Sequence, residues 1–165
     1  MNNYLFYVML VFTLLGCGTQ KHVHNSTLYE DIYVCQDDQN IFGKSLNLYR
    51  KQLNYLSKFE YSPKNDTVYI LEMYGVQGNI LITIWNKHKT LSYTNEQGSF
   101  ESKNDALFPK YMMKLISDWN ISEIRKEERD STILPRELIY ATKIIFNKGE
   151  YRIDCICFKD FFNLE

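Results

Sequence analysis

Apolar residues recur along this chain with two different periods, and each period predicts a different kind of element. From about Asn40 to Phe59 they recur at steps of three and four residues, which is typical of a helix with one apolar face. A second helix is predicted to start near Asp105, with Pro109 tolerated in its first turn. The first apolar stripe consists of Phe42, Leu46, Tyr49, Leu53 and Leu56. The second consists of Phe108, Tyr111, Met112, Leu115 and Trp119.

Between these helices the period shortens to two, and three strands are predicted at Thr67–Tyr74, Asn79–Asn86 and Thr90–Thr94. A four-residue connection after Tyr74 pairs Met73 with Ile80, Leu71 with Ile82 and Tyr69 with Ile84. The third strand then places Leu91 beside Ile84 and Tyr93 beside Ile82. This register gathers one apolar face, formed by Tyr69, Leu71, Met73, Ile80, Ile82, Ile84, Leu91 and Tyr93.

The opposite face of these strands is more apolar than a solvated face should be. It carries Glu72, Thr83 and Ser92, but also Val68, Ile70, Leu81 and Trp85. Two interpretations stay open: an exposed apolar patch that marks an interaction site, or a sheet covered on both sides. Under the first interpretation the candidate binding face consists of Trp85, Tyr74, Val68 and Ile70.

The last two predicted strands are Glu137–Phe146 and Glu150–Phe158, joined by a two-residue turn at Lys148-Gly149. This turn places Lys143 opposite Asp154, a charge pair that supports the register modestly. It also pairs Phe146 with Tyr151, Ile144 with Ile153, Thr142 with Cys155 and Tyr140 with Cys157.

The remaining segments complete the predicted domain. Leu28–Cys35 is predicted to be a short strand or a packed lead-in, and Asn95–Lys103 a loop. Residues 17–27 are polar and aperiodic and are expected to form a tether. The order of elements predicts a single α+β domain over residues 28–165. It consists of an antiparallel sheet of about five strands with two main helices packed mostly on one face.

The start of the chain is apolar from residue 4 to residue 15 apart from Thr13. This apolar run is too short for a helix that spans a membrane. Residues 1–16 are therefore predicted to be a signal peptide. The end of this segment, Leu14-Leu15-Gly16-Cys17, resembles the lipobox of bacterial lipoproteins. The resemblance implies cleavage before Cys17 and attachment of acyl chains such as palmitate there, which would hold the protein stably on a membrane. An ordinary secretory signal and a short anchor helix are the alternatives.

The predicted location is the bacterial cell envelope. The richness in Asn, Lys, Ile and Tyr is similar to that of proteins encoded by AT-rich genomes, such as those of Bacteroidota. No acidic run follows Cys17, which favours a periplasm-facing protein over one exported to the cell surface.

The balance of charges argues against nucleic acid as a partner. The chain has 19 basic and 20 acidic residues, so it lacks the strongly basic character of nucleic-acid-binding domains. This balance also gives no reason to expect a basic patch for anionic lipid.

Besides Cys17 there are three cysteines, Cys35, Cys155 and Cys157. Either Cys35 bridges to one of the other two or all three are buried thiols, and the odd number favours buried thiols.

No catalytic residue, metal site or cofactor is predicted. His22 and His24 lack a third ligand nearby, and Cys155 and Cys157 are explained by an inward-facing strand. Cys35 with His88 would form a nucleophile and base only if the fold joined them.

The leading hypothesis is a non-catalytic envelope lipoprotein whose domain binds a protein or a glycan. The alternatives are an immunity or inhibitor lipoprotein that neutralises a toxin or lytic enzyme, and a small hydrolase without a recognisable motif.

Overall fold

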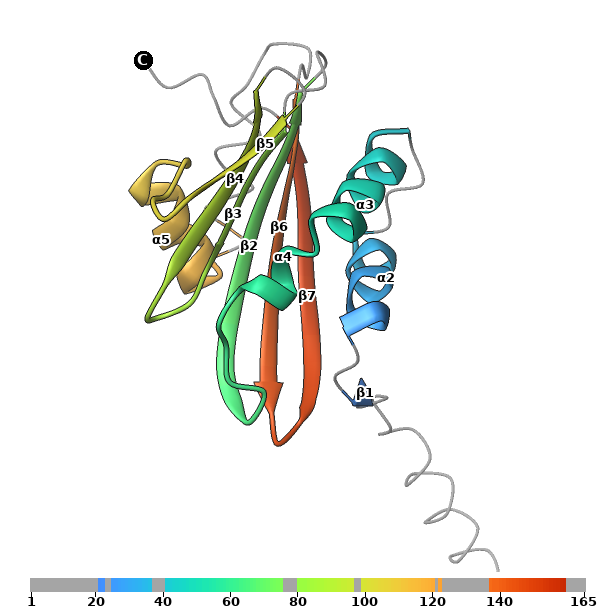
Figure 1. Ribbon diagram of the computed structural model, residues 1–165. Helices are drawn as coiled ribbons and strands as arrows, with labels where there is room; N and C mark the ends of the chain where they lie inside the picture. Colours follow the sequence, from blue (N-terminus) through green and yellow to red (C-terminus); the bar gives the residue numbers. More distant parts are fainter. Residues whose placement is uncertain are drawn as a thin grey trace, which may run out of the picture.

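In the computed structural model, one antiparallel sheet organises the chain (Figure 1). The structure describes residues 21–22, 25–36, 41–75, 80–96, 99–120, 122 and 137–159. The strands are β1 (Lys21–His22), β2 (Asn65–Gly75), β3 (Ile80–Trp85), β4 (Thr90–Glu96), β5 (Ser99–Lys103), β6 (Glu137–Asn147) and β7 (Glu150–Lys159). Their order across the sheet is β1-β7-β6-β2-β3-β4-β5. The predicted signal peptide and Cys17 lie outside the described residues.

Helices cover both faces of the sheet (Figure 1). The helices are α2 (Asn25–Cys35), α3 (Ile41–Leu53), α4 (Tyr55–Lys58) and α5 (Lys110–Asp118). The first three pack on the face that carries Val68 and Ile70, and α5 packs on the face that carries Leu71 and Met73. The predicted α+β class and antiparallel sheet are confirmed, with α5 covering the second face. Across the described ranges, no helix has the length and apolar character needed to cross a bilayer.

The β6–β7 hairpin has the register that its sequence predicts. Lys143 lies opposite Asp154, and Thr142 lies opposite Cys155. Lys148 and Gly149 have φ angles of 53° and 87°, so both turn residues are left-handed, as a tight hairpin turn of this kind requires. The Lys143 ammonium lies 5.6 Å from the centre of the Trp119 ring, and Asp154 pairs with Arg152 instead.

The predicted β2–β3 register is wrong by one residue. Ile80 lies opposite Tyr74, and Ile84 lies opposite Ile70. The predicted single apolar face is therefore divided between the two faces of the sheet. The β3–β4 register is confirmed, with Leu91 opposite Ile84.

The chain before residue 36 differs from the prediction. Leu28–Cys35 belongs to α2, because Leu28, Tyr29 and Ile32 are buried at the spacing of one helical face. The predicted tether is also shorter, since β1 pairs with β7 and α2 begins at Asn25.

The two predicted helices are present with altered limits. Asn54 has a left-handed φ of 47° and separates α3 from α4. In α5, which begins directly after Pro109, Met112 and Ile116 are buried while Tyr111 is 43% exposed. The segment predicted as a loop at Asn95–Lys103 instead contains the end of β4 and the edge strand β5.

Candidate functional site

The aromatic binding face predicted on the sheet does not exist as an open surface. Trp85 is 5% exposed, and Val68 and Ile70 are fully buried. On one face of the sheet, helices α2, α3 and α4 pack over Val68, Ile70 and the half-buried Tyr74. Trp85 lies on the other face, which α5 covers. The Trp85 Nε1–H donates to Ser117 Oγ at 3.0 Å. The interpretation of a sheet covered on both sides is confirmed, and the patch interpretation is wrong.

The cysteines also differ from the favoured prediction of three buried thiols. Cys35, the last residue of α2, forms a disulfide with Cys155 of β7, with a Cα–Cα distance of 5.8 Å. This separation is ordinary for a disulfide. Cys157 is outside the bridge and exposed. The alternative that Cys35 bridges to one of the C-terminal cysteines is confirmed, because α2 packs its last turn over β7.

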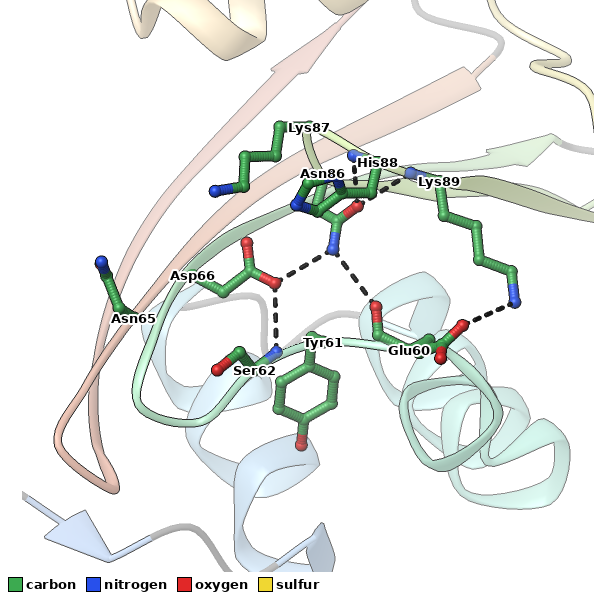
Figure 2. A pocket seen from close by; sticks show the side chains of 9 residues that line it. All are labelled: Glu60, Tyr61, Ser62, Asn65, Asp66, Asn86, Lys87, His88 and Lys89. Atoms are coloured by element: carbon green, nitrogen blue, oxygen red, sulfur yellow. Dashed lines mark hydrogen bonds and ion pairs between the residues drawn. The ribbon is translucent and has the colours of Figure 1, made fainter.

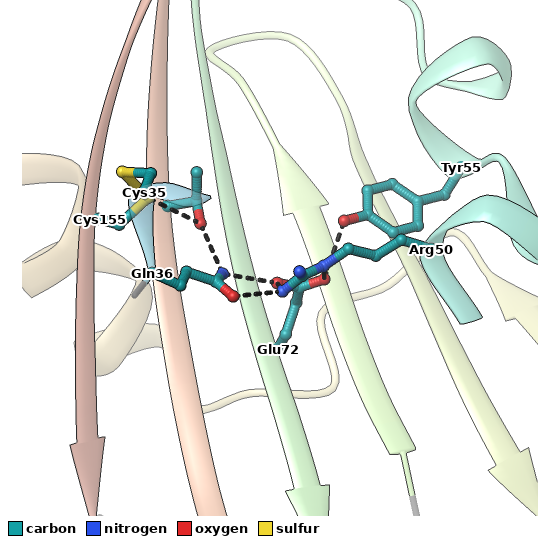
Figure 3. A network of polar contacts seen from close by, with 7 residues as sticks. Cys35, Gln36, Arg50, Tyr55, Glu72 and Cys155 are labelled. Carbon is teal, nitrogen blue, oxygen red and sulfur yellow. Dashed lines mark hydrogen bonds and ion pairs between the residues drawn. A yellow bond between two sulfur atoms is a disulfide. The ribbon is translucent and has the colours of Figure 1, made fainter. Parts of the chain in front are cut away.

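A buried ion pair lies beside this bridge, beneath α3 (Figure 3). Arg50 and Glu72 both have 0% exposed side chains. Arg50 Nε donates to Glu72 Oε1 at 2.7 Å, and Arg50 Nη2 donates to Glu72 Oε2 at 2.5 Å. Tyr55 donates its hydroxyl to Glu72 Oε1 at 2.9 Å. Gln36, next to the disulfide, accepts from Arg50 Nη2 at 2.7 Å and donates to Glu72 Oε2 at 3.2 Å.

The ion pair shifts the pKa values of its neighbours. Burial is the largest single effect and lowers the pKa of Arg50, but Glu72 and Tyr55 together outweigh it, so that pKa is raised. Burial and the negative charge of Glu72 raise the pKa of Tyr55. Every member of the network is buried, so a ligand could reach it only if the helices left the sheet. We therefore assign it a structural role, in which it ties α2, α3 and α4 to β2.

An accessible polar site lies at one end of the sheet, where a hollow of about 650 Å³ opens between two connections (Figure 2). One connection joins α4 to β2, and the other is the β3–β4 turn. The hollow is lined by Glu60, Tyr61, Ser62, Asn65, Asp66, Asn86, Lys87, His88 and Lys89.

Two side chains fix the shape of the hollow. Asn86 Oδ1 accepts from the backbone N–H groups of His88 and Lys89, both at 2.9 Å. Asn86 Nδ2 donates to the carbonyl of Glu60 at 3.2 Å and to Asp66 Oδ2 at 3.0 Å. Asp66 Oδ2 also accepts from the Ser62 N–H at 3.2 Å. These bonds clamp the two connections together.

The rim of the hollow carries charges of both signs. Lys87, His88 and Lys89 are exposed on one side, and Glu60 lies 3.7 Å from Lys89 on the other. Such a rim can bind polar or charged groups by hydrogen bonds and ion pairs. Within the described part of the chain, no group of His, Cys, Asp and Glu is arranged to hold a metal ion.

The sequence pattern does not predict this site. It predicts a turn at His88, where the only chemistry expected of this residue is that of a base for Cys35. The structure does not join these two residues: Cys35 is bonded to Cys155 on β7, whereas His88 lies in the β3–β4 turn, with β6 and β2 between. The available signal was the pair of polar connections themselves, Asn65-Asp66 and Asn86–Lys89.

Comparisons with known proteins add no further assignment. No protein-family model, curated protein or solved structure matches this chain significantly.

Proposed function

We propose that this chain is a lipid-anchored protein of the bacterial envelope, with acyl chains on Cys17 and its domain outside the cytoplasm. The observation that carries the proposal is the Cys35–Cys155 disulfide. Disulfides persist in oxidising compartments such as the periplasm and are rare in the cytoplasm. The bridge therefore supports the export that the segment Leu14–Cys17 predicts independently.

We also propose that the domain binds a polar partner at the hollow and performs no chemistry there. The hydrogen bonds and the exposure of the side chains that line the hollow support this proposal. Asp66 and Asn86 are engaged in holding the two connections, which gives a fixed shape suited to recognition. Lys87 and His88 are exposed on the rim and can contact the charged groups of a protein, glycan or lipid.

The anchor is tested by metabolic labelling of the full chain with palmitate in a bacterial host. We expect the wild type to incorporate label and Cys17→Ser to lose it. Cys157→Ser is the matched control, since this exposed cysteine lies outside the bridge, and it should label like the wild type. Alkylation of the denatured acylated protein should modify one cysteine before reduction and three after it. Label in Cys17→Ser would contradict the proposal.

The binding role is tested by a photo-crosslinking amino acid at His88, with Tyr111 on α5 as the control position. Both side chains are exposed, so neither replacement should disturb the core. We expect a crosslinked product in living cells from position 88 and none from position 111. Equal yields at the two positions would remove the evidence for a site at the hollow.

A further inference from the structure

Three connections meet at the end of the sheet that contains the hollow. The Lys148 N–H donates to the carbonyl of Lys64 at 2.9 Å, which joins the β6–β7 turn to the bend before β2. The Asn86–Asp66 bond of 3.0 Å joins the β3–β4 turn to the same bend. We call this surface the turn end and define it as residues 60–66, 86–89 and 147–150.

The turn end has four lysines, Lys64, Lys87, Lys89 and Lys148, and three acids, Glu60, Asp66 and Glu150, so its net charge is +1. Lys64, Lys87 and Lys148 are exposed, and none forms an ion pair within the described part of the chain. Of the acids, Glu60 pairs with Lys89, and Asp66 accepts hydrogen bonds from Ser62 and Asn86. Glu150 is half-buried.

The described segment closest in sequence to the predicted anchor, β1, lies beside this surface. Lys21 of β1 lies opposite Tyr151, three residues beyond Lys148. Three residues of strand extend about 10 Å. Cys17 precedes Lys21 by four residues, which span at most about 14 Å when fully extended. An acylated Cys17 therefore holds the turn end close to the bilayer.

We propose that the turn end is the membrane-facing surface of the domain, and that Lys64, Lys87 and Lys148 bind anionic phospholipid head groups. The inference rests on the proposed acylation of Cys17 and names a lipid surface as the partner of the site at the hollow. Near an anionic membrane each lysine strengthens binding roughly fivefold. Since Glu60, Asp66 and Glu150 lie on the same surface, the net charge of the turn end is +1, and the expected preference for facing anionic lipid is about fivefold.

The test uses the acylated full chain reconstituted in two kinds of vesicle, pure phosphatidylcholine and phosphatidylcholine mixed with phosphatidylglycerol. An amine-acetylating reagent followed by mass spectrometry gives the modification rate of each lysine. We expect Lys64, Lys87 and Lys148 to react several-fold more slowly in the mixed vesicles than in the neutral ones. Lys44 and Lys110, exposed in the first turns of α3 and α5, are the internal controls and should react equally in both.

A charge variant provides the second arm. In Lys64→Gln/Lys87→Gln/Lys148→Gln all three changes are at exposed positions, and Lys89 remains as a reporter at the hollow. We expect Lys89 to be protected by anionic lipid in the wild type and to react equally in both vesicles in the variant.

The outcomes separate this inference from the proposed function. Absence of fatty acid on Cys17 contradicts the proposed anchor. With the fatty acid present, equal rates for the three lysines in both vesicles overturn the inference alone. Protection in isolated envelopes but not in mixed vesicles also overturns it, because a protein or glycan would then cover the turn end.

Discussion

Arg50 shows how one buried charge constrains a core. It lies on the same helix face as Leu46 and Leu53, at the spacing of an apolar stripe. Removing an isolated charge from water costs several kcal/mol, so the position is tolerated only because Glu72 faces it with two hydrogen bonds. The two residues depend on each other, and neither is explained by its own element alone.

Breaking this pair should be costly. We expect Glu72→Gln to lower the free energy of unfolding by about 3–5 kcal/mol, because Arg50 would remain buried without a counter-charge. Replacing both residues, as Arg50→Met with Glu72→Leu, should recover much of the loss. Urea denaturation measures both variants.

The matched control is Lys51→Met, which breaks the Lys51–Glu30 pair, whose side chains are 48% and 49% exposed. An exposed pair contributes about 0–1 kcal/mol, so the control should change stability little. If Glu72→Gln costs no more than Lys51→Met, the buried pair does not stabilise the fold.

Tyr151 gives the fold a dependence on alkaline pH. Burial, together with its hydrogen bond to Asp31, raises the pKa of Tyr151 to about 12. An unfolded tyrosine has a pKa of about 10, so the folded state favours the neutral hydroxyl. This contribution is complete below pH 10 and is lost as the pH rises towards 12. We expect stability to fall across this window in denaturant titrations, and less steeply in Tyr151→Phe. An unchanged slope in the variant would contradict the assignment.

At the scale of elements, the registers show what the sequence could determine. The β6–β7 register was predictable because Gly149 marks the turn and the Lys143–Asp154 match excludes a slip. The β2–β3 register was not, because β2 is buried on both faces. Val68, Ile70, Leu71 and Met73 are all buried, so alternation carries no information about which face is inward.

Other elements were hidden for related reasons. The segment of α2 is rich in β-branched and aromatic residues, which favour a strand locally, and its packing on β7 overrides that preference. β5 is a polar edge strand, and edge strands need no apolar alternation. Glu72 shares a face of β2 with Val68 and Ile70 in either register. The Arg50–Glu72 pair was not predictable because the sequence does not show that α3 covers this face.

The disulfide fastens α2 to the sheet across a sequence separation of 120 residues. We expect Cys35→Ser/Cys155→Ser to lower the free energy of unfolding by about 2–5 kcal/mol, because the unfolded chain gains the freedom of a long open loop. Cys157→Ser is the control and should leave stability nearly unchanged. Equal stabilities of the double variant and the wild type would show that α2 is held by packing alone.

The β6–β7 turn provides a local test. Gly149 has a φ of 87°, and a Cβ there would meet nothing within 4 Å. The cost of Gly149→Ala is therefore conformational, and we expect a loss of about 1–2 kcal/mol in thermal or urea unfolding. Asn147→Ala, at an exposed position of the same hairpin, should cost less. The reverse order would mean that the turn does not require a left-handed residue.

At the scale of the whole molecule, the net charge does not show where the charged side chains lie. Near-equal numbers of acidic and basic residues gave no reason to expect a basic patch. The fold nevertheless brings Lys64, Lys87 and Lys148 from three separate connections to one end, near β1, which begins four residues after Cys17 in the sequence. The sequence separation of these lysines concealed the cluster, because only the strand pairing brings them together.

This distribution makes the orientation on a membrane sensitive to salt. The range of electrostatic attraction falls from about 10 Å at 0.1 M salt to about 3 Å at 1 M. The acyl chains hold by burial of apolar surface, which salt does not weaken. For acylated protein in mixed vesicles, we expect high salt to raise the acetylation rate of Lys148 to its value in neutral vesicles, with the protein still bound.

Flotation of the vesicles checks that the protein stays bound, and Lys110 on α5 checks that salt does not alter the reagent. If the short tether alone kept the turn end against the bilayer, Lys148 would be protected sterically. Its protection would then persist at 1 M salt and would be equal in neutral vesicles. If the acetylation rate of Lys148 changes with neither salt nor lipid charge, the tether sets the orientation and the lysines do not contribute to it.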